Sequence, residues 1–388
     1  MSGSSAYIIA ARRSANGRLG GLHRTRRLED LAGPVLDKTI EDSGLDRSAI
    51  DLLTLGNTSA IANPARLVAL IAGLGEGVPA LTIDRQNCSG LEAIIAGCRA
   101  IECGEADAVA AGGAEALSMA PWLIAKPRGL HQTPRFLALG HDDNAIPATS
   151  AEAEAANALA AHHALDRRTL DRLAFRSQES AGDANDKRLM AGEIVALRSK
   201  TNELYDEFVD GTDLEDLAAL PLIAGEGTAT AGNLTATADG AAFVIAVSRR
   251  LYERLGKPPA LAIKARATVA VAPGDGEPAS IAAARRLAQN QGFGSLGDIQ
   301  RVELGEASAA EHHVFQQALS VSQSALNADG GQLARGQPTG AAGAILLVRL
   351  FTALVRGKPD YPAGARGLSV IGGSDGQAAA MLVESVSV

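Results

Sequence analysis

Short β-rich runs alternate with Ala- and Leu-rich stretches along most of the chain, and this alternation limits the possible folds more than any other feature. Strands that are separated by helical segments pair in parallel through right-handed crossovers. The pattern therefore predicts an α/β layered domain. In the first 120 residues the expected strands are residues 7–9, 52–55, 80–83 and 106–111, and the expected helices are residues 29–42, 64–72 and 89–102.

A segment of different texture interrupts this alternation between residues 121 and 235. It has few strand signals, loops rich in Pro, His and Asp, and one long helical stretch, residues 167–190, with Asp166 placed to cap its start. The alternation resumes at Asp239. We therefore expect a first half (1–120), an inserted loop domain (121–235) and a second half (236–388), with a strand near 239–250 completing the first half.

The two α/β parts resemble each other. Residues 86–90 (Q-N-C-S-G) open a helix that leads to a strand and a Gly-Gly turn at 112–113. A Gly/Thr-rich segment, residues 330–343, likewise opens a helix that leads to a strand and a Gly-Gly turn at 372–373. This repetition suggests two related halves.

Charge and cysteine content exclude several classes of protein. The 44 acidic and 36 basic side chains leave a net charge of -8, which provides no positive field for nucleic acid. Three cysteines lack the spacing and the histidine of a metal site, so we expect no metal, no disulfide framework and a reducing compartment. No segment resembles a signal peptide or a membrane span, so we expect a cytoplasmic protein without a membrane partner.

The turn that contains Asn87 and Cys88 is the first candidate for chemistry. At a helix start the backbone N–H groups and the helix dipole favour negative charge, so a thiol there becomes a nucleophile if its pKa is lowered. The alternative is that Asn87 caps the helix and Cys88 packs as a small hydrophobic residue. Both interpretations stand at this point. Cys98 and Cys103 are expected in the core.

Other polar segments carry weaker signals. The glycine-rich residues 330–340 lack the spacing and the Lys of a phosphate-binding Walker loop, and they lack a dinucleotide fingerprint. Residues 372–376 form either an anion-binding nest of amides or a plain tight turn. The remaining clusters are expected to be solvated: His162-His163, His312-His313, and Arg24 with Arg26 and Arg27.

Six segments together resemble the thiolase family of acyl-CoA acyltransferases, in the family's order and over nearly the whole chain. They are residues 10–21, 55–57 (L-G-N), 63–66 (N-P-A-R), 112–118 (G-G-A-E-A-L-S), 227–233 (G-T-A-T-A-G-N) and 239–242 (D-G-A-A). The resemblance implies a thiolase-like fold, in which two similar βαβαβαββ halves form a five-layered αβαβα core with an inserted loop domain. It also implies CoA or acyl-CoA as ligand, with no further cofactor. Finally, it implies a homo-oligomer, a dimer or tetramer, with strand 80–83 near the subunit contact.

The family's four catalytic side chains are absent from the matching positions. The family's nucleophilic Cys in Q-C-S-S-G is replaced by Asn87, and Cys88 follows one residue late, which on a helix is a rotation of ~100°. We therefore expect Cys88 to point away from the acyl site. The other replacements are Gln337 for the His of G-H-P, Val370 for the Cys of C-x-G, and Gly305 for the Asn of N-E-A-F.

The resemblance still allows ligand binding. The backbone amides of Asn87 and Gly372 match one oxyanion pocket, while Thr235, Gly336 and Pro338 match ligand-contacting segments. Residues 146–152 match the family's H-M-G-x-T-A-E only loosely. We therefore expect a protein that binds acyl-CoA but has lost, or strongly weakened, thiolysis and Claisen condensation. Two alternatives remain: an acyltransferase, thioester hydrolase or decarboxylase that uses Cys88 or the amide pocket, and an oligomeric scaffold that binds no CoA.

Overall fold

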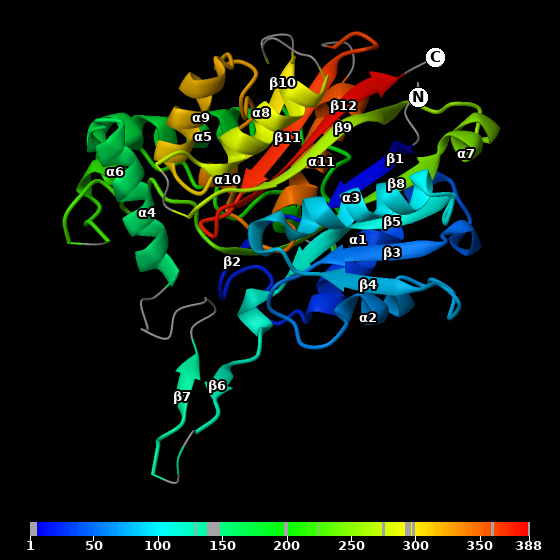
Figure 1. Cartoon of the computed structure of the whole chain (residues 1–388), viewed down its shortest axis with the longest axis horizontal. Coiled ribbons are helices and arrows are strands. Elements are labelled where there is room, and N and C mark those ends of the chain that lie inside the picture. The colour runs from blue at the N-terminus through cyan, green and yellow to red at the C-terminus, as the bar shows by residue number, and fades with distance from the viewer. Residues whose placement is uncertain are drawn as a thin grey trace.

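A continuous sheet joins the two halves of the molecule (Figure 1). The computed structural model describes residues 6–127, 129, 131–137, 148–197, 201–223, 225–273, 276–291, 296, 299–357 and 361–386. The first half contains β1 (Ala6–Arg13), β2 (Gly17–Arg18), α1 (Leu28–Ser43), β3 (Leu52–Gly56), α2 (Pro64–Ile71), β4 (Ala80–Ile83), α3 (Ser89–Glu102), β5 (Ala108–Glu115) and, after the insertion, β8 (Ala238–Ser248).

The second half follows the short helix α7 (Arg249–Arg254). Its elements are β9 (Ala260–Ala270), α8 (Ala279–Gln291), β10 (Arg301–Gly305), α9 (Ala309–Leu319), α10 (Gln332–Arg335), α11 (Ala342–Phe351), β11 (Arg366–Gly372) and β12 (Gln377–Val386). A π-helical turn, Thr352–Arg356, extends α11. The strand predicted before the Gly-Gly turn at 372–373 is therefore β11.

The strands run in the order β10-β11-β12-β9-β1-β8-β5-β3-β4, and β2 pairs with β8 at its side. The halves meet where β1 pairs with β9, with Tyr7 opposite Ala262. Parallel pairing is confirmed for β3 with β4 and β5, and for β10 with β11. It is wrong for the rest of the path, where pairs such as β5 with β8 and β11 with β12 are antiparallel.

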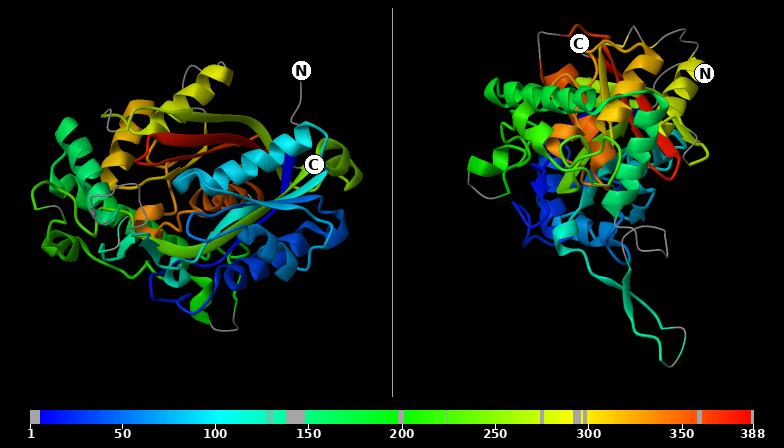
Figure 2. Two further views of the ribbon diagram at one scale, coloured as in Figure 1. Left: turned by 60° about the horizontal axis from the view of Figure 1, so that its bottom comes forward. Right: turned by 90° about the vertical axis from the view of Figure 1, so that its left-hand side faces the viewer.

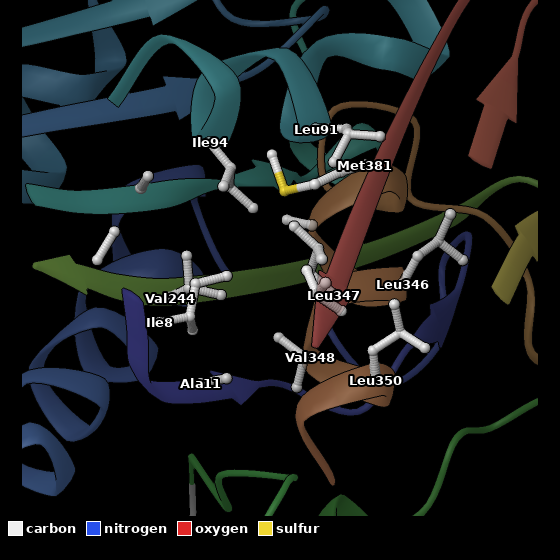
Figure 3. Close-up of a cluster of buried hydrophobic side chains, with 14 of the residues drawn as sticks. Ile8, Ala11, Leu91, Ile94, Val244, Leu346, Leu347, Val348, Leu350 and Met381 are labelled. Atoms are coloured by element: carbon white, nitrogen blue, oxygen red, sulfur yellow. The ribbon is translucent and has the colours of Figure 1, made fainter. Parts of the chain in front are cut away.

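Five layers result from the way the helices cover this sheet. One hydrophobic cluster packs α1 and α2 against the first-half strands, and another packs α8 and α9 against the second-half strands. Helices α3 and α11 lie between the two sets of strands, in a third cluster that contacts both (Figures 1 and 3). The expected αβαβα layering is confirmed.

Small residues let the helices of the central layer approach the strands closely. A Cβ on Gly113 would stand 2.1 Å from the carbonyl oxygen of Gly340, and one on Gly90 would stand 2.8 Å from the same atom. Side chains are therefore excluded where the starts of α3 and α11 meet β5. Farther along, the core is aliphatic, with Leu91, Ile94 and Leu347 among the buried side chains of Figure 3.

The two halves are not identical repeats. The third strand of the second half is reduced to a single parallel bridge between Val302 and Leu326. In its place the chain runs through the glycine-rich segment 330–340, which α10 interrupts. The repeat predicted from the sequence therefore holds for the layers but not for every strand.

The helices of the insertion gather at one end of the molecule beside α9, whereas its β-hairpin projects away from the body (Figures 1 and 2). Its elements are the hairpin β6 (Leu123–Ala125) and β7 (Arg135–Leu137), then α4 (Ala148–His162), α5 (Arg167–Asp186) and α6 (Leu214–Ala219). The Asp166 carboxylate accepts from Thr169 N at 2.7 Å, as expected for a cap, but α5 ends at Asp186 rather than near residue 190.

Candidate functional site

The turn before α3 holds the first site residue in a constrained backbone. Residues Gln86–Cys88 form a 3₁₀ turn in which Gln86 has a φ of 47°, in the left-handed region. The hydroxyl of Ser89 fixes this turn, because it donates to Gln86 O at 2.6 Å and accepts from Arg85 N at 2.8 Å. Asn87 is half-buried, and its Nδ2 donates to Gly372 O at 3.4 Å. The structure thus joins two expected site residues, Asn87 and Gly372.

The sulfur of Cys88 lies in the central hydrophobic core. The residue is 1% exposed and packs with Leu91 and Ile371. Its thiol donates to Ile371 O at 3.6 Å and to Gln377 O at 3.7 Å. Burial raises the pKa of the Cys88 thiol to about 12. Of the two interpretations, the structure agrees with the second: Cys88 packs as a small hydrophobic residue and carries its proton at neutral pH.

A cavity of about 380 Å³ opens beside Gly372. Its wall comes from α4, the start of α8, the start of α9 and the turn after β11, and it is mostly apolar. Three carboxyl side chains reach it, those of Glu152, Glu277 and Glu311. Of the expected site residues within the described part of the chain, Gly372 belongs to this wall.

Gln337 is a buried amide in a backbone-paired segment. Its N donates to Ala236 O at 2.8 Å, and its O accepts from Ala238 N at 3.1 Å. The side-chain Nε2 is buried without a hydrogen-bond partner among the described residues. An amide at this point neither accepts nor returns a proton at neutral pH.

The flanking residues Gly336 and Pro338 are packed. A Cβ on Gly336 would stand 2.5 Å from the Phe208 ring, and Pro338 covers Gly240 in the same way. Both residues are buried and lie outside the wall of the cavity.

Gly305 and Val370 belong to neighbouring parallel strands, β10 and β11. A Cβ on Gly305 would stand 2.8 Å from Ile371 Cδ1, so Ile371 occupies the space that a side chain at position 305 would need. Val370 is fully buried in the cluster under α8 and α9. Both positions are filled by packing and carry no polar group.

The hydroxyl of Thr235 is already engaged. It donates to Glu306 O at 2.7 Å, while Thr235 N donates to Ala307 O at 2.9 Å. Thr235 therefore holds the turn that leads into α9, and its hydroxyl can only accept from a ligand. Most of the loosely matched segment 146–152 lies outside the residues whose side chains are described.

Buried carboxylates near the site were not singled out from the sequence. Glu115 is fully buried and accepts from Asn57 Nδ2, Gly340 N and Thr58 Oγ1 at 2.9, 2.9 and 2.7 Å. It thereby joins the first half to the start of α11. Its signal was present in the G-G-A-E-A-L-S match, where Glu is the charged residue.

Glu306 and Glu311 hold the turn before α9. Burial raises the pKa of Glu306 to about 8, although Asn327 Nδ2 donates to it at 2.6 Å. Burial also raises the pKa of Glu311, whose oxygens accept from Ser280 Oγ at 2.7 Å and Ala307 N at 2.9 Å. No pattern in the sequence distinguished Glu311 from a surface residue of a polar helix.

A buried ionic network holds the glycine-rich segment 330–340 in place. Asp206 accepts from Arg13 Nη1 at 2.6 Å and from Arg335 Nη1 at 2.8 Å, and all three side chains are buried. Burial opposes ionisation of Asp206, but the two guanidinium groups outweigh it and hold the pKa of that carboxyl below its usual range. Glu193 joins Arg13 and Arg349 in the same way.

Three further sequence expectations need correction. Cys103 is exposed rather than in the core, because it follows the last turn of α3, whereas Cys98 is buried as expected. Arg26 is buried and pairs with Glu203 at 2.6 Å instead of lying in solvent. His312 is not solvated: burial lowers its pKa to about 4, and its Nδ1 has no partner among the described residues.

The described residues include neither a membrane-spanning helix nor a metal-binding cluster. They contain no helix long and apolar enough to cross a bilayer. They also contain no group of three or more His, Cys, Asp or Glu side chains arranged to hold a metal ion.

Comparisons with solved structures match the whole architecture. A crystal structure of the Bacillus anthracis acetyl-CoA acetyltransferase superimposes with a TM-score of 0.89 at 27% identity, over 99% of each chain. A crystal structure of human mitochondrial 3-ketoacyl-CoA thiolase gives a TM-score of 0.87, also at 27% identity and 99% coverage of each chain.

Sequence comparisons agree with this match. The putative acetyl-CoA C-acetyltransferase VraB of Staphylococcus epidermidis is 33% identical over 355 residues, covering 89% of this chain and 91% of its own. A beta-ketoadipyl-CoA thiolase of Pseudomonas aeruginosa is 31% identical over 408 residues, covering 98% and 99%. The family models "Thiolase, N-terminal domain" and "Thiolase, C-terminal domain" match residues 6–250 and 257–385. With nearly its whole length matched in this way, the chain belongs to the thiolase family.

Proposed function

We propose that this chain binds an acyl-CoA thioester beside Gly372 and has lost, or retains only weakly, the carbon–carbon chemistry of thiolases. Membership of the family supports acyl-CoA as the ligand class. The observation that carries the second half of the proposal is the amide at Asn87, which contacts Gly372 where the resemblance places the acyl-accepting sulfur.

The nearby sulfur does not replace that nucleophile in this arrangement. Cys88 is buried, and because its pKa is raised to about 12 it is almost entirely protonated at neutral pH. The thiolate, rather than the thiol, attacks a thioester. Loss of a nucleophile from a cooperating catalytic set lowers rates by factors on the order of 10⁴ to 10⁶.

Ligand binding and turnover are measured separately. Calorimetric titration with acetyl-CoA is expected to show saturable binding that Ala272→Trp, which fills the cavity wall, weakens. Ala191→Trp, an exposed site outside that wall, serves as the control. In parallel, condensation of acetyl-CoA is followed by release of CoA thiol and thiolysis by loss of acetoacetyl-CoA. Turnover at the rate of an ordinary thiolase that Cys88→Ala abolishes would refute the proposed loss.

One observation favours a second candidate, a thioester hydrolase or decarboxylase. The cavity wall includes Glu311, Ser308 and Gly372, and burial raises the pKa of the Glu311 carboxyl above its ordinary value, which favours a role in proton transfer. Turnover of malonyl-, acetyl- or 3-ketoacyl-CoA that Glu311→Gln removes would support it. Failure with the whole panel would exclude it.

We also propose that the chain forms a homo-oligomer, a dimer or tetramer. Strand β4 is an edge strand of the sheet. The apolar side chains of Leu67 and Ile71 on α2 and of Leu81 on β4 are exposed. An unpaired edge strand with apolar neighbours is a surface that pairs readily with another chain. Light scattering is expected to give at least twice the monomer mass, and a monomer at micromolar concentration would contradict the proposal. A stable oligomer that gives no heat with acetyl-CoA would instead support the scaffold alternative.

A further inference from the structure

Two adjoining clefts lie between α5 and α9, apart from the cavity beside Gly372. Their volumes are about 540 Å³ and about 530 Å³, and they share part of their walls, including Arg176 and Gln316. In Figure 1 these helices stand at the end of the molecule formed by the insertion. Neither cleft has a wall residue in common with the cavity beside Gly372.

The walls of both clefts carry positive and protonatable groups without acids. Arg172, Arg176 and His313 line the first cleft, and Arg176 and His312 line the second. Among the described residues, no Asp or Glu lines either cleft. In a chain with a net charge of -8, a concave wall of this composition is a local concentration of positive charge.

The two arginines are not neutralised by ion pairs. They stand four residues apart on α5, so like charges face the same cleft at a spacing that destabilises a helix. Within the described part of the chain, Arg176 donates only to the neutral Gln323, at 3.4 Å, and Arg172 has no ion pair. Asp166 attracts Arg172, but its carboxylate is engaged by Thr169 N at the helix cap.

An independent observation is the unsatisfied imidazole in the wall of the second cleft. His312 Nδ1 is buried and has no hydrogen-bond partner among the described residues. Burial lowers the pKa of this ring, and the nearby His313 and Arg176 lower it further. Burial and the nearby His163 lower the pKa of His313 in the same way. Orphaned buried nitrogens are rare in folded proteins and call for a partner. An anion bound here would offset the positive charge of Arg176 and would accept from His312 Nδ1 in the tautomer that protonates this nitrogen.

We propose that the α5–α9 clefts bind a phosphate-bearing anion through Arg172 and Arg176, with the amide and hydroxyl donors of Gln316, Gln323 and Ser320 completing the site. Guanidinium groups bind phosphate oxygens in bidentate fashion, and the neighbouring neutral donors suit the remaining oxygens. The shared chemistry is a di- or triphosphate-like group, either free or on a nucleotide. This site is separate from the proposed acyl-CoA cavity.

The test uses the full chain and two probes, inorganic pyrophosphate and ADP, in calorimetry and thermal-shift measurements at matched ionic strength in chloride. The expected result is saturable binding of at least one probe. The double variant Arg172→Gln/Arg176→Gln should weaken it at least about ten-fold. The control Arg168→Gln/Arg24→Gln removes the same charge from exposed arginines outside both clefts and should change affinity less than about two-fold.

The probes distinguish the two sources of the phosphate group. Tighter binding of ADP than of pyrophosphate indicates a nucleotide, and the reverse indicates a free phosphate compound. No binding of either probe at 10 mM (roughly the weakest specific affinity worth assigning), or equal weakening in the control, would overturn the proposal. Acetyl-CoA titration separates it from the proposed function, because the Arg172/Arg176 variant should bind acetyl-CoA as the wild type does. A parallel loss would show that the clefts are not a separate site.

Discussion

At the scale of single residues, the strand positions predicted to belong to the site are closely packed. Ile371 fills the space beside Gly305, and Val370 belongs to the hydrophobic core. Neither position leaves room for a larger side chain without a change in its neighbours. The Asn that the resemblance implies at position 305 would clash with Ile371, so introducing that side chain requires repacking.

The cysteines should differ sharply in reactivity. At pH 8 we expect iodoacetamide to modify the exposed Cys103 and to leave Cys88 and Cys98 unmodified, because burial raises the pKa of both buried thiols to about 12. With such a pKa, roughly one thiol in 10⁴ is ionised at pH 8. Peptide mapping by mass spectrometry reads the outcome. Labelling of Cys88 in the folded protein as fast as that of Cys103 would contradict this assignment.

Glu306 should make the protein less stable as pH rises. Its folded-state pKa of about 8 exceeds the unfolded value near 4.3, so the folded state binds more protons between these limits. The free energy of unfolding therefore falls from pH 5 to pH 8. Urea denaturation should show a smaller fall for Glu306→Gln, a near-isosteric neutral replacement. The exposed Glu179→Gln is the control. An unchanged pH slope in Glu306→Gln would refute the prediction.

At the scale of elements, most helices and strands could be predicted, because apolar periodicity and caps are local signals. Helix 89–102 was expected with the same bounds as α3, and strand 80–83 with those of β4. Antiparallel pairing of β5 with β8 could not be predicted, since it joins segments more than 120 residues apart. The single bridge at Leu326 could not be predicted for a related reason. Whether a strand forms there depends on the segment that pairs with it, rather than on local propensity.

The contact between β5 and the start of α11 should not tolerate a methyl group. A Cβ on Gly113 would meet backbone atoms of Gly340 and Ala341, which cannot rotate away. We expect Gly113→Ala to lower the free energy of unfolding by about 2–4 kcal/mol. Gly75→Ala is the matched control, because a Cβ there meets nothing within 4 Å. Equal stability of the two variants in urea would show that the layers are less tightly apposed.

At the scale of the whole molecule, the buried ionic network joins all three parts of the chain. Arg13 comes from β1, Glu193 and Asp206 from the insertion, and Arg335 and Arg349 from the second half. Sequence reasoning did not find this network, because it pairs charges that are 129 to 193 residues apart. Conversely, the residues that the resemblance places at the family's catalytic positions could be named from the sequence alone, since naming them depends on identity and not on geometry.

Acid should therefore weaken the assembly of the three parts. The pKa of Asp206 lies below its ordinary value, so this carboxylate stabilises the fold above pH ~4 and loses that contribution as pH falls further. Asp206→Asn should cost about 3–5 kcal/mol at pH 7, by leaving two buried arginines short of a partner, and should flatten the loss of stability as pH falls below ~4. The exposed Asp183→Asn should do neither. Equal acid sensitivity of Asp206→Asn and wild type in thermal denaturation would argue against this role.

Intact-mass spectrometry after incubation with acetyl-CoA tests most directly whether this thiolase-family chain forms an acyl-enzyme. The wild type should keep its mass, and no cysteine peptide should gain an acetyl group of about 42 Da. Asn87→Cys supplies the comparison, because it places sulfur at the position that contacts Gly372. A stable acetyl adduct on Cys88 of the wild type would contradict the account, since a buried, protonated thiol would then be acting as the acyl carrier.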